Sequence, residues 1–231
     1  MSLALLLVAL FLWCLERQRH LLAILPALAA GLARPLAAPL AATAVVMLAL
    51  AIRERRADGR WPTASPWWGP LALAVVTVAG VALWPAVAAV VTGEPQAYLL
   101  TEAAWWGGTG QLGVSMFLIF LVGALGAPLG VTAAVLLVVG AAAMMGSRPV
   151  RRLGAPMWAW TGAYLGYLIL LAPIDSATPR LLLGAFPLAG AAALVVRRPV
   201  SRAVLLVVLL ALQVAFLFFI WRATSDGSPH P

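Results

Sequence analysis

Two arginines stand beside prolines and apart from the other basic residues of the chain. Arg34 precedes Pro35, and Arg180 follows Pro179. A guanidinium carries its donors in a planar fork that suits phosphate oxygens, so we expect both side chains to bind a phosphate group. Such contacts would stabilise charge that develops on a leaving phosphate during group transfer. The alternative is that each arginine reaches lipid headgroups or caps a helix end.

A single carboxylate lies between two aromatic residues at helical spacing. If residues 96–106 form a helix, Tyr98, Glu102 and Trp105 share one face at i, i+4 and i+7. Aromatic faces stack on sugar rings, while Glu102 is placed to accept hydroxyl hydrogen bonds or act as a base. The spacing therefore favours a carbohydrate site with Glu102 as a weak catalytic candidate. The simpler interpretation is an interfacial helix with its aromatic residues at headgroup level.

A second carboxylate, Asp175, lies in the short sequence PIDSATP, five residues before Arg180. One hypothesis is that it orients that arginine or contacts acceptor hydroxyls. The more common role of an aspartate next to Ser176 and Thr178 is in a turn or a helix cap.

The remaining patterns predict no cofactor and no metal. The glycines of GGTGQLG (107–113) spell G-x-G-x-x-G, but a dinucleotide fingerprint needs a preceding strand and an acidic residue about twenty positions later. His20 and His230 are isolated, and the single cysteine, Cys14, lies within an apolar run. These residues offer neither a ligand cluster nor a disulfide framework.

The elements that must position these residues are apolar. Of 231 residues, 64% are hydrophobic and 10% are charged, whereas about a quarter are charged in soluble domains. All fifteen basic residues are arginines in short clusters between apolar runs, which indicates membrane topology and not a nucleic-acid partner. Because lipid admits helices, whose backbone groups bond internally, we expect an all-α polytopic bundle in a cell membrane, with membrane lipid as a partner.

The apolar runs predict about eight spans in one transmembrane domain, residues 1–222. They are 1–15, 21–33, 36–52, 69–91, 128–145, 157–172, 181–196 and 203–221. We expect an external segment over 92–127, in which 114–126 is re-entrant or interfacial, and a disordered tail over 223–231.

Arginine placement predicts the orientation of these spans. Twelve of the fifteen arginines lie in four loops, which eight spans bring to one side, and arginine excess marks the cytoplasmic side. Arg34, Asp175, Arg180 and the segment 92–127 then face outward. Trp158 and Trp160 at the start of one span suit an aromatic belt at headgroup level.

Four stretches resemble a known family of enzymes. They are RHLLAILPALAAGLARPLAAPL (19–40), GEPQAYLLTEAAW (93–105), RRLGAPMWAWTGAYLGYL (151–168) and SATPRLLLGAFPL (176–188). Their order and spacing resemble those of actinobacterial mannosyltransferases of the PIG-V-like kind, in the GT-C class of polytopic glycosyltransferases. The resemblance implies a polyprenyl-phosphate sugar donor, with Arg34 and Arg180 at its phosphate, and an outward-facing acceptor.

The chain also departs from that class. GT-C enzymes carry an acidic catalytic residue in a large external loop near the amino terminus, and no such loop precedes Met1. We therefore expect the later portion of a mannosyltransferase, with a second membrane subunit as a possible source of missing helices. The alternative is an inactive subunit or remnant of that family. A transporter fragment is less favoured, because the predicted spans lack the ionisable residues that transport requires.

Overall fold

The computed structural model describes residues 2–33, 36–57, 68–105, 118, 121–123, 125–170, 181–196 and 198–225. Across these ranges the chain is helical and forms no strand. The predicted all-α class is therefore confirmed.

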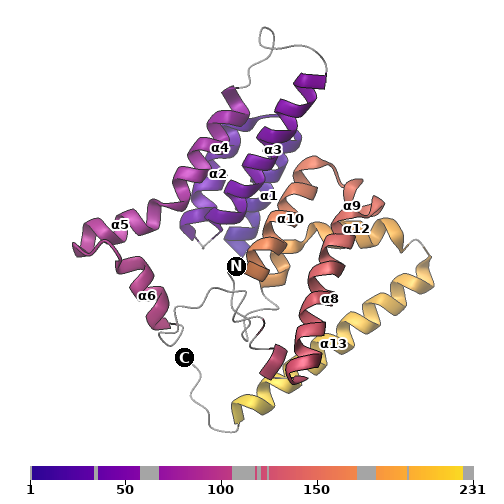
Figure 1. The fold of residues 1–231 in the computed structure, drawn as a ribbon. Coiled ribbons are helices and arrows are strands. Elements are labelled where there is room, and N and C mark those ends of the chain that lie inside the picture. Colours follow the sequence, from indigo (N-terminus) through magenta and orange to yellow (C-terminus); the bar gives the residue numbers. More distant parts are fainter. Residues whose placement is uncertain are drawn as a thin grey trace.

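Five helices form a packed bundle: α1 (Ser2–Glu16), α2 (His20–Ala33), α3 (Ala37–Ala57), α4 (Trp68–Val81) and α10 (Ala155–Leu170). The others are α5 (Leu83–Thr92), α6 (Ala97–Trp105), α8 (Ala127–Gly146), α9 (Arg148–Arg151), the 3-10 helix η1 (Leu183–Ala185), α12 (Pro187–Val195) and α13 (Pro199–Ser225). Figure 1 shows them spreading from the bundle, with α5 and α6 on one side and α8, α12 and α13 on the other.

Small side chains let the bundle helices approach closely. Helix α1 packs on α2, α2 on α4 and α4 on α3, and α10 closes the group against α3 and α1. On α2 the buried positions are Ala23, Ala27 and Ala30, at i, i+4 and i+7. Alanine at such positions suits helices that associate in lipid, where tight packing replaces the hydrophobic effect as the driving force.

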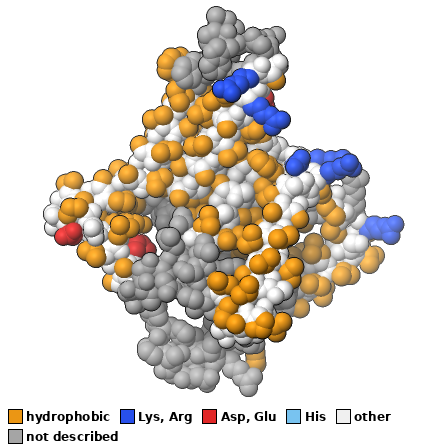
Figure 2. Space-filling model, viewed as in Figure 1, with side chains coloured by type: hydrophobic (Ala, Val, Ile, Leu, Met, Phe, Trp, Pro, Cys, Tyr) orange, Lys and Arg blue, Asp and Glu red, His pale blue; other side chains and the backbone are white. Residues whose placement is uncertain are grey.

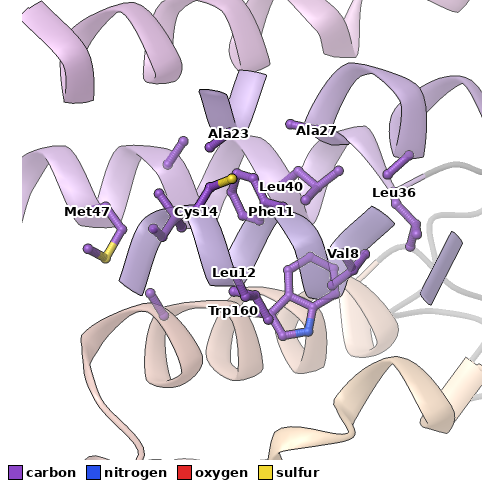
Figure 3. Packing of buried hydrophobic residues seen from close by; sticks show 14 of the residues in the cluster. Val8, Phe11, Leu12, Cys14, Ala23, Ala27, Leu36, Leu40, Met47 and Trp160 are labelled. Carbon is purple, nitrogen blue, oxygen red and sulfur yellow. The ribbon is translucent and has the colours of Figure 1, made fainter. Parts of the chain in front are cut away.

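Larger side chains fill the space between α1, α3 and α10. Val8, Leu12 and Trp160 are almost fully enclosed, and Figure 3 shows the indole of Trp160 lying against the α1 side chains. Leu36 and Leu40, at the start of α3, complete this part of the core. The core thus joins the first forty residues to α10, which is more than a hundred residues away in sequence.

The outer helices bury very little. Helix α5 has no buried residue, and on α8 the buried position is Gly130. Helix α13 exposes apolar residues along its length, among them Val200, Leu206 and Leu210. Hydrophobic side chains also cover most of the described surface in Figure 2. Such a surface matches the lipid environment that the composition predicts.

Three helical stretches are long and apolar enough to cross a membrane: Ala37–Glu54, Trp68–Thr92 and Ala127–Gly146. Shorter apolar helices cover Ser2–Glu16, His20–Ala33 and Pro199–Ala215. The prediction of apolar membrane helices is confirmed at this level, whereas the total of eight spans stays a prediction.

Two predicted spans contain a break in the helix, each near a proline. The span predicted over 69–91 is confirmed as the apolar stretch Trp68–Thr92, and it has a break at Ala82 between α4 and α5, because Pro85 lacks the N–H that would bond to the carbonyl of Val81. The span predicted over 181–196 divides into η1 and α12, which begins at Pro187. At the other end of the chain α13 continues through Ser225, three residues into the predicted tail.

Candidate functional site

Most of the predicted site residues fall outside the described part of the chain. These are Arg34, Asp175 and Arg180, together with the side chain of Trp105. The described neighbours of the two arginines nevertheless meet. Leu36, two residues after Arg34, and Leu181, one residue after Arg180, line the same cavity.

The Leu36–Leu181 cavity lies between α1, α10 and the start of η1. Its other lining residues are Ala4, Leu5, Val8, Trp160, Tyr164 and Gly184. The volume is about 20 Å³, room for about one water molecule. The cavity therefore marks where two distant segments meet, and it is too small to enclose a sugar ring.

Two aromatic side chains of α10 fix the chain at the edge of this cavity. The indole Nε1 of Trp160 donates to the carbonyl of Gly184 at 2.8 Å, and the hydroxyl of Tyr164 donates to the carbonyl of Leu181 at 2.6 Å. The two rings stack with centroids 5.2 Å apart and planes 20° apart. Residues 181–184 are thus held by two hydrogen bonds from one face of α10.

Gly184 is required by this arrangement, since a Cβ at that position would overlap the phenol ring of Tyr164. Sequence reasoning missed this contact and placed Trp160 in an aromatic belt. That placement is wrong, because the side chain is 0% exposed and its N–H bonds to protein. The available signal was the spacing of Trp160, Tyr164 and Tyr167 at i, i+4 and i+7, which puts three aromatic residues on one helix face.

The described walls of the cavity carry no Asp, Glu, His or Arg side chain. They are apolar apart from Trp160 and Tyr164, whose polar atoms both bond to backbone carbonyls. Across the described residues, no cluster of three His, Cys, Asp or Glu side chains could hold a metal ion. Any acid, base or phosphate ligand at this cavity must therefore come from the adjoining segments.

The predicted helix around Glu102 is present as α6. Tyr98 and Glu102 share a face, as their spacing predicts, and the structure shows that they are also hydrogen bonded. Tyr98 is half-buried and Glu102 is exposed. Burial raises the pKa of Tyr98, and the negative charge and hydrogen bond of Glu102 raise this pKa further. The proposed sugar-binding role of the pair stays a prediction.

The structure does not bring Glu102 to the Leu36–Leu181 cavity. Helix α6 packs chiefly on α5, and α5 meets the bundle through α4. Glu102 is also absent from the residues that line the cavity. The candidate base thus lies apart from Leu36 and Leu181, the described neighbours of the candidate phosphate ligands.

Comparisons with models of protein families, with curated proteins and with solved structures found nothing that matches this chain. The functional conclusion therefore comes from the residues and their geometry.

Proposed function

We propose that this chain is a multi-pass membrane protein whose arginine-rich end lies in the cytoplasm. Three stretches long and apolar enough to span support this, as do the apolar outer helices. The described arginines of the four clusters lie in turns or near helix ends, and Figure 2 shows basic side chains on one side of the molecule, which is the arrangement that the positive-inside rule favours for a protein crossing several times. We propose the bacterial plasma membrane as its location.

At the opposite, outward-facing end, the protein binds the phosphate of a polyprenyl-phosphate sugar between Arg34 and Arg180. The observation that carries this proposal is that Leu36 and Leu181 line one cavity. Consecutive Cα atoms are about 3.8 Å apart, so the Cα of Arg34 is within about 7.6 Å of that of Leu36, and the Cα of Arg180 is about 3.8 Å from that of Leu181. A guanidinium side chain is long enough to reach a shared phosphate from such positions.

In this proposal the chain is part of a mannosyltransferase. The two guanidinium groups hold the donor phosphate and stabilise the charge left on it when the sugar departs. Trp160 and Tyr164 act by position, because they hold residues 181–184 in place without touching the donor. Tyr98, Glu102 and Asp175 are the candidates for contact with the sugar or its acceptor.

A second candidate is a non-catalytic subunit or remnant of the same family, which binds the lipid-linked sugar and transfers nothing. It is favoured by one observation, namely that no described carboxylate lines the cavity. A transporter fragment is less favoured. The buried polar side chains in the described ranges are Thr43, Thr77 and Thr161, and none of them is ionisable.

Donor binding and sugar transfer distinguish the two candidates. Membranes containing the whole chain would be tested for binding of polyprenyl phosphate and for transfer of labelled mannose from polyprenyl-phosphate mannose. We expect Arg34→Ala and Arg180→Ala to abolish both, with membrane insertion unchanged. Arg222→Ala, which removes the same side chain outside both the proposed donor site and the four arginine clusters, is the matched control and should retain both. Binding without transfer in the unaltered chain would favour the subunit, and no binding would refute both.

The proposed orientation has its own test. Single cysteines would be placed by Arg55→Cys or Arg180→Cys in a Cys14→Ser background, which removes the one native thiol. An impermeant thiol reagent added outside the cell should label position 180 and leave position 55 unlabelled. Labelling of position 55 from outside would overturn the orientation.

A further inference from the structure

Turns that are far apart in sequence meet at the arginine-rich end. A Cβ built on Gly154 would lie 2.9 Å from the Oε1 of Glu16, so the α1–α2 turn touches the turn between α9 and α10. Gly154 also has a φ of +94°, a left-handed conformation that glycine adopts without strain. This contact brings Arg17 and Arg19 into the neighbourhood of Arg151 and Arg152.

Two further contacts extend the same end. Gly69, at the start of α4, lies against the His20 side chain of the α1–α2 turn. Gly190 of α12 lies against Leu153, and α12 packs on α9. The end of α3, the α1–α2 turn, the α9–α10 turn and the start of α13 therefore form one surface, which we call the basic end.

The basic end has a large excess of positive charge. Glu16 and Glu54 are its described acidic side chains. Its described arginine side chains number nine: Arg17, Arg19, Arg53, Arg56, Arg148, Arg151, Arg152, Arg198 and Arg202. All nine are exposed, and Figure 2 shows basic side chains gathered over the end of α3, over α9 and beside the α12–α13 turn.

Exposed apolar residues lie on the helices that lead into these charges. The guanidinium of Arg17 lies 5.6 Å from the ring centroid of Trp13, which is itself half-exposed. On α8, Val138 and Val139 are exposed two to three turns before Arg148. A ligand that fits this surface has an anionic head and an apolar tail.

We propose that the basic end is a binding site for anionic phospholipids, centred on Arg17, Arg19, Arg151 and Arg152. The positive-inside rule requires arginine in each loop but does not require the loops to meet, so their convergence is a property of the fold. Lipid is favoured over a soluble polyanion because the arginines lie at the ends of apolar helices, where the headgroups of a surrounding bilayer would lie. Guanidinium groups bind phosphodiester oxygens, while the apolar helix faces contact acyl chains.

The site is tested by lipid binding to the whole chain in nanodiscs. Discs of phosphatidylcholine would be titrated with phosphatidylglycerol or cardiolipin, and bound lipid would be counted by native mass spectrometry. We expect the double variant Arg17→Gln, Arg151→Gln to weaken anionic-lipid binding roughly 30-fold at low salt. This factor corresponds to the loss of two arginines, each of which contributes about 1 kcal/mol near a charged surface. Binding should also fall with rising salt.

A charge-matched variant separates this site from overall net charge. Arg222→Gln with Ser225→Glu lowers the net charge by the same two units outside both proposed sites and should leave phosphatidylglycerol binding unchanged. Equal losses in the two double variants would overturn the proposal. Inorganic polyphosphate would also be tested with the protein in phosphatidylcholine discs. If polyphosphate binds as tightly as anionic lipid does, the lipid-binding proposal is overturned in favour of a soluble polyanion. Polyprenyl-phosphate binding is measured separately, so failure here leaves the proposed function intact.

Discussion

The packed bundle and the outer helices have similar composition but opposite packing. Helix α1 is as apolar as α8, yet α1 buries six residues and α8 buries one. In the bundle, alanines and fitted aromatic side chains bring helices into contact. On α8 and α13, the valines and leucines point away from the rest of the described chain. Apolar character alone therefore does not decide which helices pack.

The difference follows from the solvent. In water an exposed apolar helix face costs free energy, so apolar residues collect into a core. In lipid that driving force between helices is absent, and packing depends on van der Waals fit and on hydrogen bonds between helices. The bundle supplies both through its small residues and through the bonds of Trp160 and Tyr164. Matched substitutions in the bundle and in the outer helices test this difference in packing.

Loss of a large side chain should give the largest contrast. Trp160→Ala removes a fully buried indole and its hydrogen bond to Gly184, and we expect about 3–5 kcal/mol of destabilisation. Phe218→Ala, on the exposed face of α13, should change stability by less than about 0.5 kcal/mol. Unfolding in mixed micelles with increasing denaturing detergent measures both. Equal effects would mean that α13 is as tightly packed as the bundle.

Addition of one methyl group should sharpen the contrast. Gly184→Ala places a Cβ on the ring of Tyr164, and such overpacking costs about 1–3 kcal/mol. At Gly140 of α8 a Cβ meets nothing within 4 Å, so Gly140→Ala should be neutral or stabilising by up to about 1 kcal/mol through helix propensity. Thermal unfolding of the two variants in the same detergent gives the comparison. Destabilisation by Gly140→Ala would reveal a partner for α8.

A smaller contrast comes from two threonines in the same local setting. Thr43 in α3 and Thr132 in α8 each donate at 2.7 Å to the carbonyl of the proline four residues earlier. Thr43 is buried and Thr132 is exposed. Because both alanine variants lose the same bond, we expect Thr43→Ala to cost about 1 kcal/mol more, since it also leaves a small cavity where a buried methyl group made van der Waals contacts. No difference between them would show that α3 packs no better than α8.

The smallest effect concerns α6. Glu102→Gln removes the charge that adds to the raised pKa of Tyr98, so this pKa should move toward 10.0 and stay above it, because burial remains. Ultraviolet absorbance titration measures it, with Tyr98→Phe assigning the signal. The raised pKa stabilises the fold at pH values below 10.0, and this contribution is lost as the pH rises through the folded-state pKa. If the pKa of Tyr98 is unchanged in Glu102→Gln, Tyr98 and Glu102 do not interact in the folded protein.

The sequence predicted the fold best where one apolar run forms one helix. The runs that became α1, α2, α3 and α8 were located to within a few residues, apart from the end of α3, because length and apolar content define them. The predictions did not include the helix breaks near Pro85 and Pro187, where a missing backbone donor interrupts an apolar run. For the candidate site, helical spacing correctly paired Tyr98 with Glu102, since residues four apart in a helix are neighbours.

The sequence alone determined the solvent of this protein, its helical class and the clustering of its arginines, because these depend on composition and on short-range order. Only the tertiary structure decided that Leu36 meets Leu181, that Trp160 is buried, and that Glu16 touches the turn at Gly154. The contacts of Leu36 with Leu181 and of Glu16 with Gly154 join residues more than a hundred positions apart. The burial of Trp160 depends on equally distant side chains of α1. Apolar helices of similar composition allow many pairings, and the fit of particular side chains selects one.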